Sequence, residues 1–303
     1  MADSNIIRID PAPPTDNLRQ TLLKRNAKER KRRFIVPISS WGGKERVLYW
    51  LNVSEGLLHL ASAIAALVVA IVYAPQSYLS ELRTDFIAYD ANSTAFGVDS
   101  RSLGYYALIW VDIPAFPLIT AAFHLSIAFW PAVWEYYIDQ VKNKGSNPLR
   151  WIEYSITASL MTWVILQLSG VTNIFILVVV GVLMNIALQA MGYIQEKVKQ
   201  LTYMPTVIGW LLFVGQWTII MGYFFAAVTS ERTPGAATVP WFVYVIIIGL
   251  FFMFSAFGFV QLAGVAEYLS PYQQEIALSI LSLTAKLFLT WNLLIGIALN
   301  PIK

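Results

Sequence analysis

Seven long apolar runs constrain the fold of this sequence more than any other feature. Each run reaches about 20 residues, the length at which an α-helix crosses about 30 Å of hydrocarbon. The chain is 57% hydrophobic and only 13% charged, whereas a water-soluble domain carries roughly a quarter charged residues. We therefore expect an all-α integral membrane protein, a bundle of seven transmembrane helices. The predicted spans are Leu48–Tyr73, Trp110–Trp134, Leu149–Leu168, Asn173–Ile194, Met204–Ala227, Val239–Ala266 and Ile276–Leu299.

The residue types that are scarce exclude several kinds of chemistry. The 303 residues include no cysteine, which excludes disulfides, thiolate nucleophiles and zinc sites built on cysteine. With two histidines in the whole chain, a metal centre with several histidine ligands is not expected. No internal repeat is visible, which argues against a transporter built from repeats. The prediction is a membrane protein without enzymatic activity.

Basic residues are distributed unevenly along the chain. Residues 1–47 hold 11 of the 21 lysines and arginines, and five more fall on the same predicted side, against four on the other. This bias predicts a cytoplasmic N-terminus and an extracellular C-terminus, in the cell membrane. We expect residues 1–47 to form a flexible cytoplasmic tail and residues 48–303 the membrane domain. The basic run from Lys24 to Arg33 can attract anionic lipid or nucleic acid, but a plain cytoplasmic tail is the favoured interpretation.

The first extracellular loop, residues 74–109, is long enough to fold on its own. Its sequence Phe86-Ile-Ala-Tyr is followed by Asp90 and Gly97, a pattern of strand formers and turn formers that is compatible with a β-hairpin.

Lys286 is the only lysine or arginine in the central part of any predicted span. A lysine at this depth requires a carboxylate partner, an uncharged state or a covalent partner such as an aldehyde that forms a Schiff base. A purely structural ion pair is the alternative. Glu153 is the predicted partner, because it lies roughly 9 Å into the third span and Lys286 roughly 15 Å into the seventh. Since helical side chains point back toward the N-terminus, the lysine nitrogen reaches toward the depth of Glu153.

A second polar group is predicted on the first two spans. Glu55 and His59 lie one turn apart on one helix, and His124 falls at a comparable depth on the next. They can form a polar cavity that stores or passes protons, or a hydrogen-bonded cluster without proton traffic. Asp112 is expected to be a solvated residue at a helix end.

Other residues within the spans are predicted to line or brace the bundle. Amide side chains that are expected to bond between helices are Asn185, Gln189 and Gln216. Aromatic side chains that can wall an elongated apolar chromophore, or serve only in packing, are Phe254, Phe257, Trp163, Trp217 and Trp291.

Four segments, in order along the chain, resemble the heliorhodopsins. They are Arg150-Trp-Ile-Glu-Tyr-Ser-Ile-Thr-Ala-Ser, Gly192-Tyr-Ile-Gln-Glu-Lys, Val239-Pro-Trp-Phe-Val-Tyr and Leu281-Ser-Leu-Thr-Ala-Lys. The resemblance runs from the first span to the end, and the predicted cytoplasmic N-terminus agrees with it. The chain differs from the usual pattern in its long basic tail and in Glu55.

The resemblance implies a rhodopsin-like bundle that binds all-trans-retinal. Retinal would be held as a protonated Schiff base on Lys286, with Glu153 as counterion and Ser282 beside it. His59 and His124 would border an internal polar cavity, while Asn185, Trp217 and Phe254 would belong to the retinal pocket. A homodimer with a slow photocycle is also implied.

Light sensing, with a signal passed to a cytoplasmic partner, is therefore the leading hypothesis. The alternative is a light-gated proton or ion conductance, or a light-driven pump. Ordinary outward pumps carry an Asp one turn before the lysine and a second acid eleven residues after the counterion, where this chain has Ser282 and Val164. A membrane scaffold that works without light, and recruits partners through the basic tail, is a further alternative.

Overall fold

The computed structural model describes residues 41–73, 79–90, 95–230 and 238–299. The chain divides into two compact units, Met1–Gly42 and Gly43–Lys303, and the fold below is that of the second unit. Nearly all of the predicted basic tail, including the run from Lys24 to Arg33, lies outside the described residues.

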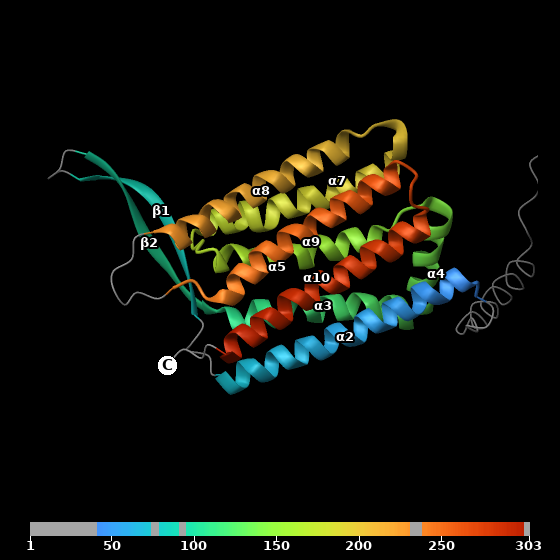
Figure 1. The fold of residues 1–303 in the computed structure, drawn as a ribbon, viewed down its shortest axis with the longest axis horizontal. Coiled ribbons are helices and arrows are strands. Elements are labelled where there is room, and N and C mark those ends of the chain that lie inside the picture. Colours follow the sequence, from blue (N-terminus) through green and yellow to red (C-terminus); the bar gives the residue numbers. More distant parts are fainter. Residues whose placement is uncertain (1–40, 74–78, 91–94, 231–237, 300–303) are drawn as a thin grey trace, which may run out of the picture. The chain divides into compact units, whose positions relative to one another are not determined.

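Seven long helical segments make up most of the described part of the chain and lie side by side as a bundle (Figure 1). One of them is continuous through α6, a π-helical stretch and α7. The predicted all-helical bundle is confirmed. The helices are α2 (Gly43–Tyr73), α3 (Leu108–Phe129), α4 (Pro131–Asp139), α5 (Pro148–Leu168), α6 (Ile174–Ile176), α7 (Met184–Val198), α8 (Met204–Thr229), α9 (Trp241–Val265) and α10 (Pro271–Leu299), with π segments η2 (Gln140–Lys144) and η3 (Leu177–Leu183) and a 3₁₀ turn η4 (Lys199–Leu201).

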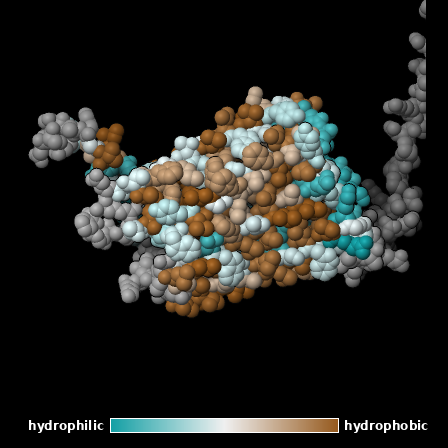
Figure 2. Space-filling model, viewed as in Figure 1, coloured by the Kyte–Doolittle hydropathy of each residue, from teal (hydrophilic) through white to brown (hydrophobic). Residues whose placement is uncertain are grey.

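Within the described ranges, six helical segments are long and apolar enough to cross a membrane. The third predicted span, which is α5, is not among them, because polar residues such as Glu153 and Gln167 lower its hydropathy. These residues are compatible with a bundle because α5 packs against α3 and α7 inside it. The outward faces carry exposed large apolar side chains, for example Leu57, Ile64 and Phe252, and Figure 2 shows brown and pale residues along much of the visible helix surface.

Proline and asparagine set the ends of two helices. Helix α5 begins at Pro148, and the Asn147 side chain accepts a hydrogen bond from the Arg150 amide at 3.2 Å. The predicted end of the second span at Trp134 is wrong, since α3 ends at Phe129 and α4 starts at Pro131. Proline disfavours helical backbone at the residue before it, and Trp130 is accordingly extended.

The predicted hairpin is present between α2 and α3 (Figure 1). Strand β1 (Leu79–Asp90) pairs antiparallel with β2 (Ala95–Ala107), and the register shifts between Leu82 and Arg83. Two bonds fasten the hairpin to the turn between α5 and α6. The Arg83 amide donates to the Thr172 carbonyl at 2.9 Å, and Asn173 Nδ2 donates to Asp85 Oδ2 at 2.7 Å.

Candidate functional site

Lys286 and Glu153 form an ion pair in the interior of the bundle. Lys286 comes from the middle of α10 and Glu153 from the second turn of α5. Each residue is only 3% exposed, and Lys286 Nζ bonds directly to Glu153 Oε1. The depth argument from the sequence therefore brings together the same two residues that the structure pairs.

Hydroxyl groups on two helices hold the Glu153 carboxylate in place. Thr120 Oγ1 on α3 and Thr157 Oγ1, one turn along α5, both donate to Glu153 Oε1 at 2.9 Å. The Lys286 ammonium also lies 5.1 Å from the centre of the Tyr154 ring, within the range of a cation–π contact. A buried ion pair is stable only when its remaining bonding capacity is satisfied, and these contacts supply part of that capacity.

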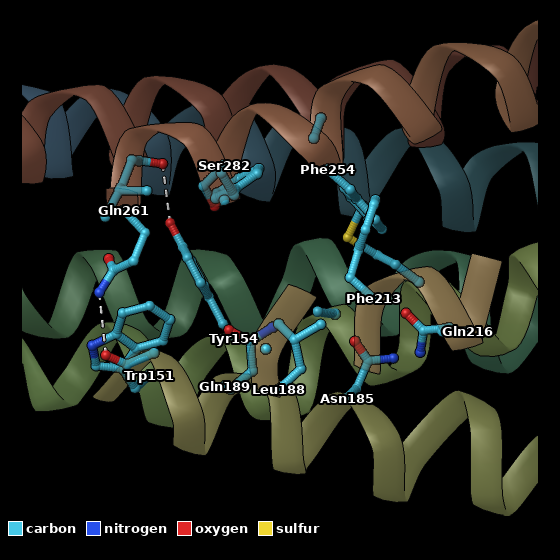
Figure 3. Close-up of a pocket in the computed structure, with 18 of the residues that line it drawn as sticks. Trp151, Tyr154, Asn185, Leu188, Gln189, Phe213, Gln216, Phe254, Gln261 and Ser282 are labelled. Atoms are coloured by element: carbon cyan, nitrogen blue, oxygen red, sulfur yellow. Dashed lines mark hydrogen bonds between the residues drawn. The ribbon is translucent and has the colours of Figure 1, made fainter. Parts of the chain in front are cut away.

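A large pocket extends from this ion pair between α5, α7, α8, α9 and α10. It encloses about 990 Å³ of space between atoms, part of which is open to the surroundings. Figure 3 shows its elongated form, with Gln261 and Trp151 toward one end and Asn185 and Gln216 toward the other. Lys286 is the only lining residue in the described chain with a cationic side chain. The predicted site residues that line it are Lys286, Ser282, Asn185, Phe254 and Phe257, together with Gln189 and Gln216.

Three predicted aromatic residues do not line this pocket. Trp217 is buried behind it, and its ring centre lies 6.1 Å from that of Phe254. Trp163 bonds through Nε1 to the Tyr106 hydroxyl at 2.6 Å, away from the pocket. Trp291 is 44% exposed. Spacing along a helix identifies the inward face, but it does not say which layer of the interior a large ring occupies.

The polar side chains at one end of the pocket bond to backbone carbonyls. Gln216 Nε2 on α8 donates to the Val180 carbonyl in η3 at 2.7 Å, which is the contact between helices that the sequence predicts. Asn185 Nδ2 instead donates to the Gly181 carbonyl of its own helical segment, at 2.9 Å. Each of these amides thus directs one donor to the backbone, and the lining of the pocket as a whole is mainly apolar and aromatic.

The predicted group on the first two spans is also present. His124 Nε2 lies 2.7 Å from Glu55 Oε2, and His124 Nδ1 lies 2.8 Å from Asn52 Oδ1. His59 is fully buried, and neither of its ring nitrogens has a hydrogen-bond partner among the described residues. The structure thus joins Glu55 to His124 and leaves His59 with unsatisfied bonding capacity beside them.

Asp112 differs from its prediction as a solvated residue at a helix end. It is 6% exposed and accepts a hydrogen bond from the Tyr106 hydroxyl at 2.8 Å. Burial, as the largest cause, raises the pKa of Tyr106 above its usual range. The hairpin supplies Tyr106, six positions before Asp112, and Trp163 of α5 bonds to the same hydroxyl, so hydropathy alone does not reveal the covering of Asp112.

A further buried charge cluster was not predicted from the sequence. Arg150 at the start of α5 bonds to Glu196 on α7 and to Glu275 on α10, and all three residues are less than 10% exposed. Trp151 Nε1 adds a bond to Glu196 at 2.8 Å. From the sequence, Arg150 counts as a basic residue near a helix end. The available signal was that the Arg150 and Glu196 segments both contribute to the family resemblance.

The bundle has the fold of a rhodopsin. The crystal structure of the transmembrane domain of the Salpingoeca rosetta rhodopsin phosphodiesterase is similar to it, with a TM-score of 0.61. That similarity covers 90% of this chain and 89% of the other, at 12% sequence identity, and therefore concerns the fold alone.

Within that class, the chain belongs to the heliorhodopsin family, whose sequence model matches residues 48–298. No curated protein sequence matches the chain. The family indicates a retinal-binding, light-responsive membrane protein, and its match extends across all seven long helical segments.

Proposed function

We propose that the protein is a light sensor in which all-trans-retinal is bound as a protonated Schiff base on Lys286. The observation that carries this proposal is the position of Lys286, a buried amine on the wall of a large, mostly apolar pocket. Small-molecule sites are typically concave and mostly apolar with a few polar groups, and this pocket has that character. Aromatic side chains such as Phe254 and Phe257 suit a conjugated apolar chain. The residues present therefore fit retinal.

Glu153 is the proposed counterion. Its carboxylate is already bonded to the Lys286 nitrogen, and Thr120 and Thr157 fix its orientation. A negative charge at this point stabilises a positive charge on that nitrogen. Ser282, one turn before Lys286 on α10, also lines the pocket and lies on the same side of it.

When bound, retinal supplies light absorption and isomerisation, while the protein supplies the shape and charge around it. Lys286 and Glu153 couple α10 to α5, so a change at their contact acts on both helices. We propose a slow photocycle in which this change reaches a cytoplasmic signalling partner. A homodimer in the cell membrane, with the N-terminus in the cytoplasm and the C-terminus outside, completes the proposal, which involves no enzymatic activity.

A light-gated proton or ion conductance is the second candidate. The buried contact between Glu55 and His124 favours it, because two groups that can exchange a proton lie 2.7 Å apart inside the membrane domain. Photocurrents recorded under voltage clamp separate the two candidates, since a sensor gives none.

Reconstitution with all-trans-retinal tests the main proposal. The wild-type protein should gain a visible absorption band that Lys286→Ala abolishes. Lys142→Ala, which removes a mostly exposed lysine that pairs with Glu45, should retain the band and serves as the control. A full band in the Lys286→Ala protein would contradict the assignment, and a wild-type protein without a band would favour the light-independent scaffold.

A further inference from the structure

A second, smaller cavity lies beside the Lys286–Glu153 pair. It encloses about 310 Å³ of space between atoms and has both Glu153 and Glu275 in its wall, together with His124 and Arg150. Glu275 is in the first turns of α10, whereas Lys286 is eleven residues further along the same helix. The cavity therefore connects the pair at the centre of the bundle with the buried charge cluster at its end. The lining is largely apolar, but the polar side chains in its wall can bind an ordered water.

Glu275 is held by neutral donors as well as by Arg150. Its Oε1 accepts hydrogen bonds from Asn147 Nδ2 at 2.7 Å and from the Tyr137 hydroxyl at 3.1 Å, while Oε2 bonds to Arg150. Tyr137 is 1% exposed. Burial, and then the neighbouring Glu275 carboxylate, raises the pKa of Tyr137 well above its usual range. Tyr137 thus remains a neutral hydroxyl that both donates and accepts a proton.

The charges of the cluster do not balance. Arg150 brings one positive charge to the two carboxylates of Glu196 and Glu275. Lys197, which follows Glu196, bonds to Ser146 Oγ at 2.8 Å rather than to either carboxylate. Arg150 Nε is buried and has no hydrogen-bond partner among the described residues. An unbalanced buried charge is costly, so protonation of one of the two carboxylates would leave the cluster with one positive and one negative charge.

Polar side chains continue from the cluster toward the centre of the bundle. Tyr137 lies beside Asn52, which in turn contacts His124 Nδ1 at 2.8 Å. Tyr137, Asn52 and His124 all line the small cavity. These three polar side chains therefore share one cavity wall with Glu153 and Glu275.

We propose that Glu275 is a second proton-binding residue, which receives a proton from Glu153 across this cavity. In the transfer, the carboxylic acid of Glu153 loses its proton and becomes a carboxylate, and the carboxylate of Glu275 gains it and becomes a neutral acid. Tyr137 carries the proton by accepting one on its oxygen as it donates its own to Glu275. The cluster then holds one positive and one negative charge. This inference rests on the proposed function only for the arrival of the proton at Glu153.

The ionisable groups around Glu275 come from five helices packed in this part of the bundle. They are Arg150, Glu153 and Tyr154 on α5, Glu196 on α7, Tyr137 on α4, His124 on α3 and Glu55 on α2. Within the described chain, the η2 lysines pair elsewhere, Lys142 with Glu45 and Lys144 with Asp139. Of these groups, Glu275 is the carboxylate that shares the cavity with Glu153 and also bonds to Tyr137.

An infrared titration of the purified protein without retinal tests proton binding directly. Acidification should produce a carboxylic acid band from a buried site, and Glu275→Gln should remove that band. Glu267→Gln changes an exposed carboxyl group in the turn between α9 and α10, and should leave the band unchanged. A band of full intensity in the Glu275→Gln protein overturns the inference, whether or not the protein binds retinal.

Flash infrared spectroscopy of the retinal-loaded protein tests the transfer. The wild type should show a transient carboxylic acid signal that Glu275→Gln abolishes while the visible band is retained. Tyr137→Phe removes the carrier without a change of charge and should slow the signal by about 10-fold or more, since a positioned proton carrier contributes about 10²–10⁴-fold. Should Glu275→Gln fail to fold, a wild-type rate in the Tyr137→Phe protein overturns the path. The absence of a visible band in the wild-type protein would contradict the proposed function and would leave the titration of the retinal-free protein as the test of Glu275.

Discussion

Lys286 and Glu153 are 133 positions apart in the sequence, yet the lysine nitrogen bonds directly to the glutamate carboxylate in the interior of the bundle. Removal of either partner leaves one buried charge without compensation, which costs about 3–5 kcal/mol in measured cases. Since the two side chains come from α10 and α5, the pair is both the candidate chromophore site and an ion pair that links these two helices.

Glu153→Gln is expected to shift the visible band of the retinal-loaded protein to the red. The anion stabilises the positive charge near Lys286 in the ground state, and its removal narrows the gap to the excited state. Without retinal, the same change should lower the free energy of unfolding by about 3–5 kcal/mol. Absorption spectra and thermal unfolding measure the two effects. An unchanged spectrum would speak against the counterion role, and exposed Glu267→Gln is the control.

Arg150→Met should destabilise the protein strongly, because it leaves Glu196 and Glu275 buried without a cation. The expected loss is about 3–5 kcal/mol, and most of it should return when both carboxylates are also replaced by Leu. Thermal unfolding in detergent, followed by circular dichroism, provides the comparison.

Lys142→Met is the matched control for the Arg150 series. It removes one partner of a mostly exposed ion pair with Glu45, at 3.3 Å. Its effect should stay below about 1 kcal/mol. Equal losses in the two single variants would show that the Arg150 cluster contributes no more than a surface ion pair.

Gly258→Ala should weaken retinal binding. A methyl group at Gly258 would lie 2.5 Å from the Trp210 ring, which lines the large pocket. Because Trp210 already packs against Phe213 and Phe259, its displacement narrows the pocket, and overpacking of this kind costs about 1–3 kcal/mol. Titration of the retinal-free protein should therefore show an affinity reduced about 10-fold. Gly222→Ala on α8 meets no atom within 4 Å and should bind as the wild type does.

Tyr106→Phe should reduce the loss of stability at alkaline pH. The pKa of Tyr106 in the folded protein is raised above its usual value of about 10. Its contribution to stability is therefore complete below about pH 10 and is lost as the pH rises beyond it, because the unfolded chain releases the proton first. The unfolding temperature of the wild type should fall more steeply above about pH 10 than that of the variant. The exposed neighbour Tyr105→Phe should retain the wild-type slope.

The parts of this structure that the sequence predicts are those for which the membrane imposes a severe physical requirement. A helix must be about 20 residues long to cross hydrocarbon, so length and hydropathy predict the helical spans, of which α5 is the most polar. A cation in the middle of a span requires a compensating negative charge, so the position of Lys286 predicts a carboxylate partner, and Glu153 lies at a suitable depth. The hairpin follows from local strand and turn preferences.

The features that escaped prediction depend on contacts between distant segments. Arg150 lies near a helix end, where a charge is usually solvated, and only the approach of Glu196 and Glu275 reveals its burial. Asp112 is covered by the nearby Tyr106, whose hydroxyl also contacts Trp163 and Gln167 of the distant α5. Trp217 is buried, but it packs against Phe254 and does not itself line the pocket. Hydropathy and helical period specify the direction of a side chain and leave its neighbours undetermined.

The π segment Leu177–Leu183 sets the rotational phase of the helix that contains it. A π turn closes its hydrogen bond one residue later than an α turn, so it absorbs a surplus residue that would otherwise rotate the remaining helix by about 100°. Asn173, which anchors the hairpin, and Asn185, which lines the pocket, lie on opposite sides of this segment. The number of residues between Asn173 and Asn185 therefore fixes how the hairpin anchor is rotated relative to the pocket. Apolar substitutions within this stretch keep that rotation, whereas the gain or loss of one residue would change it by about 100°.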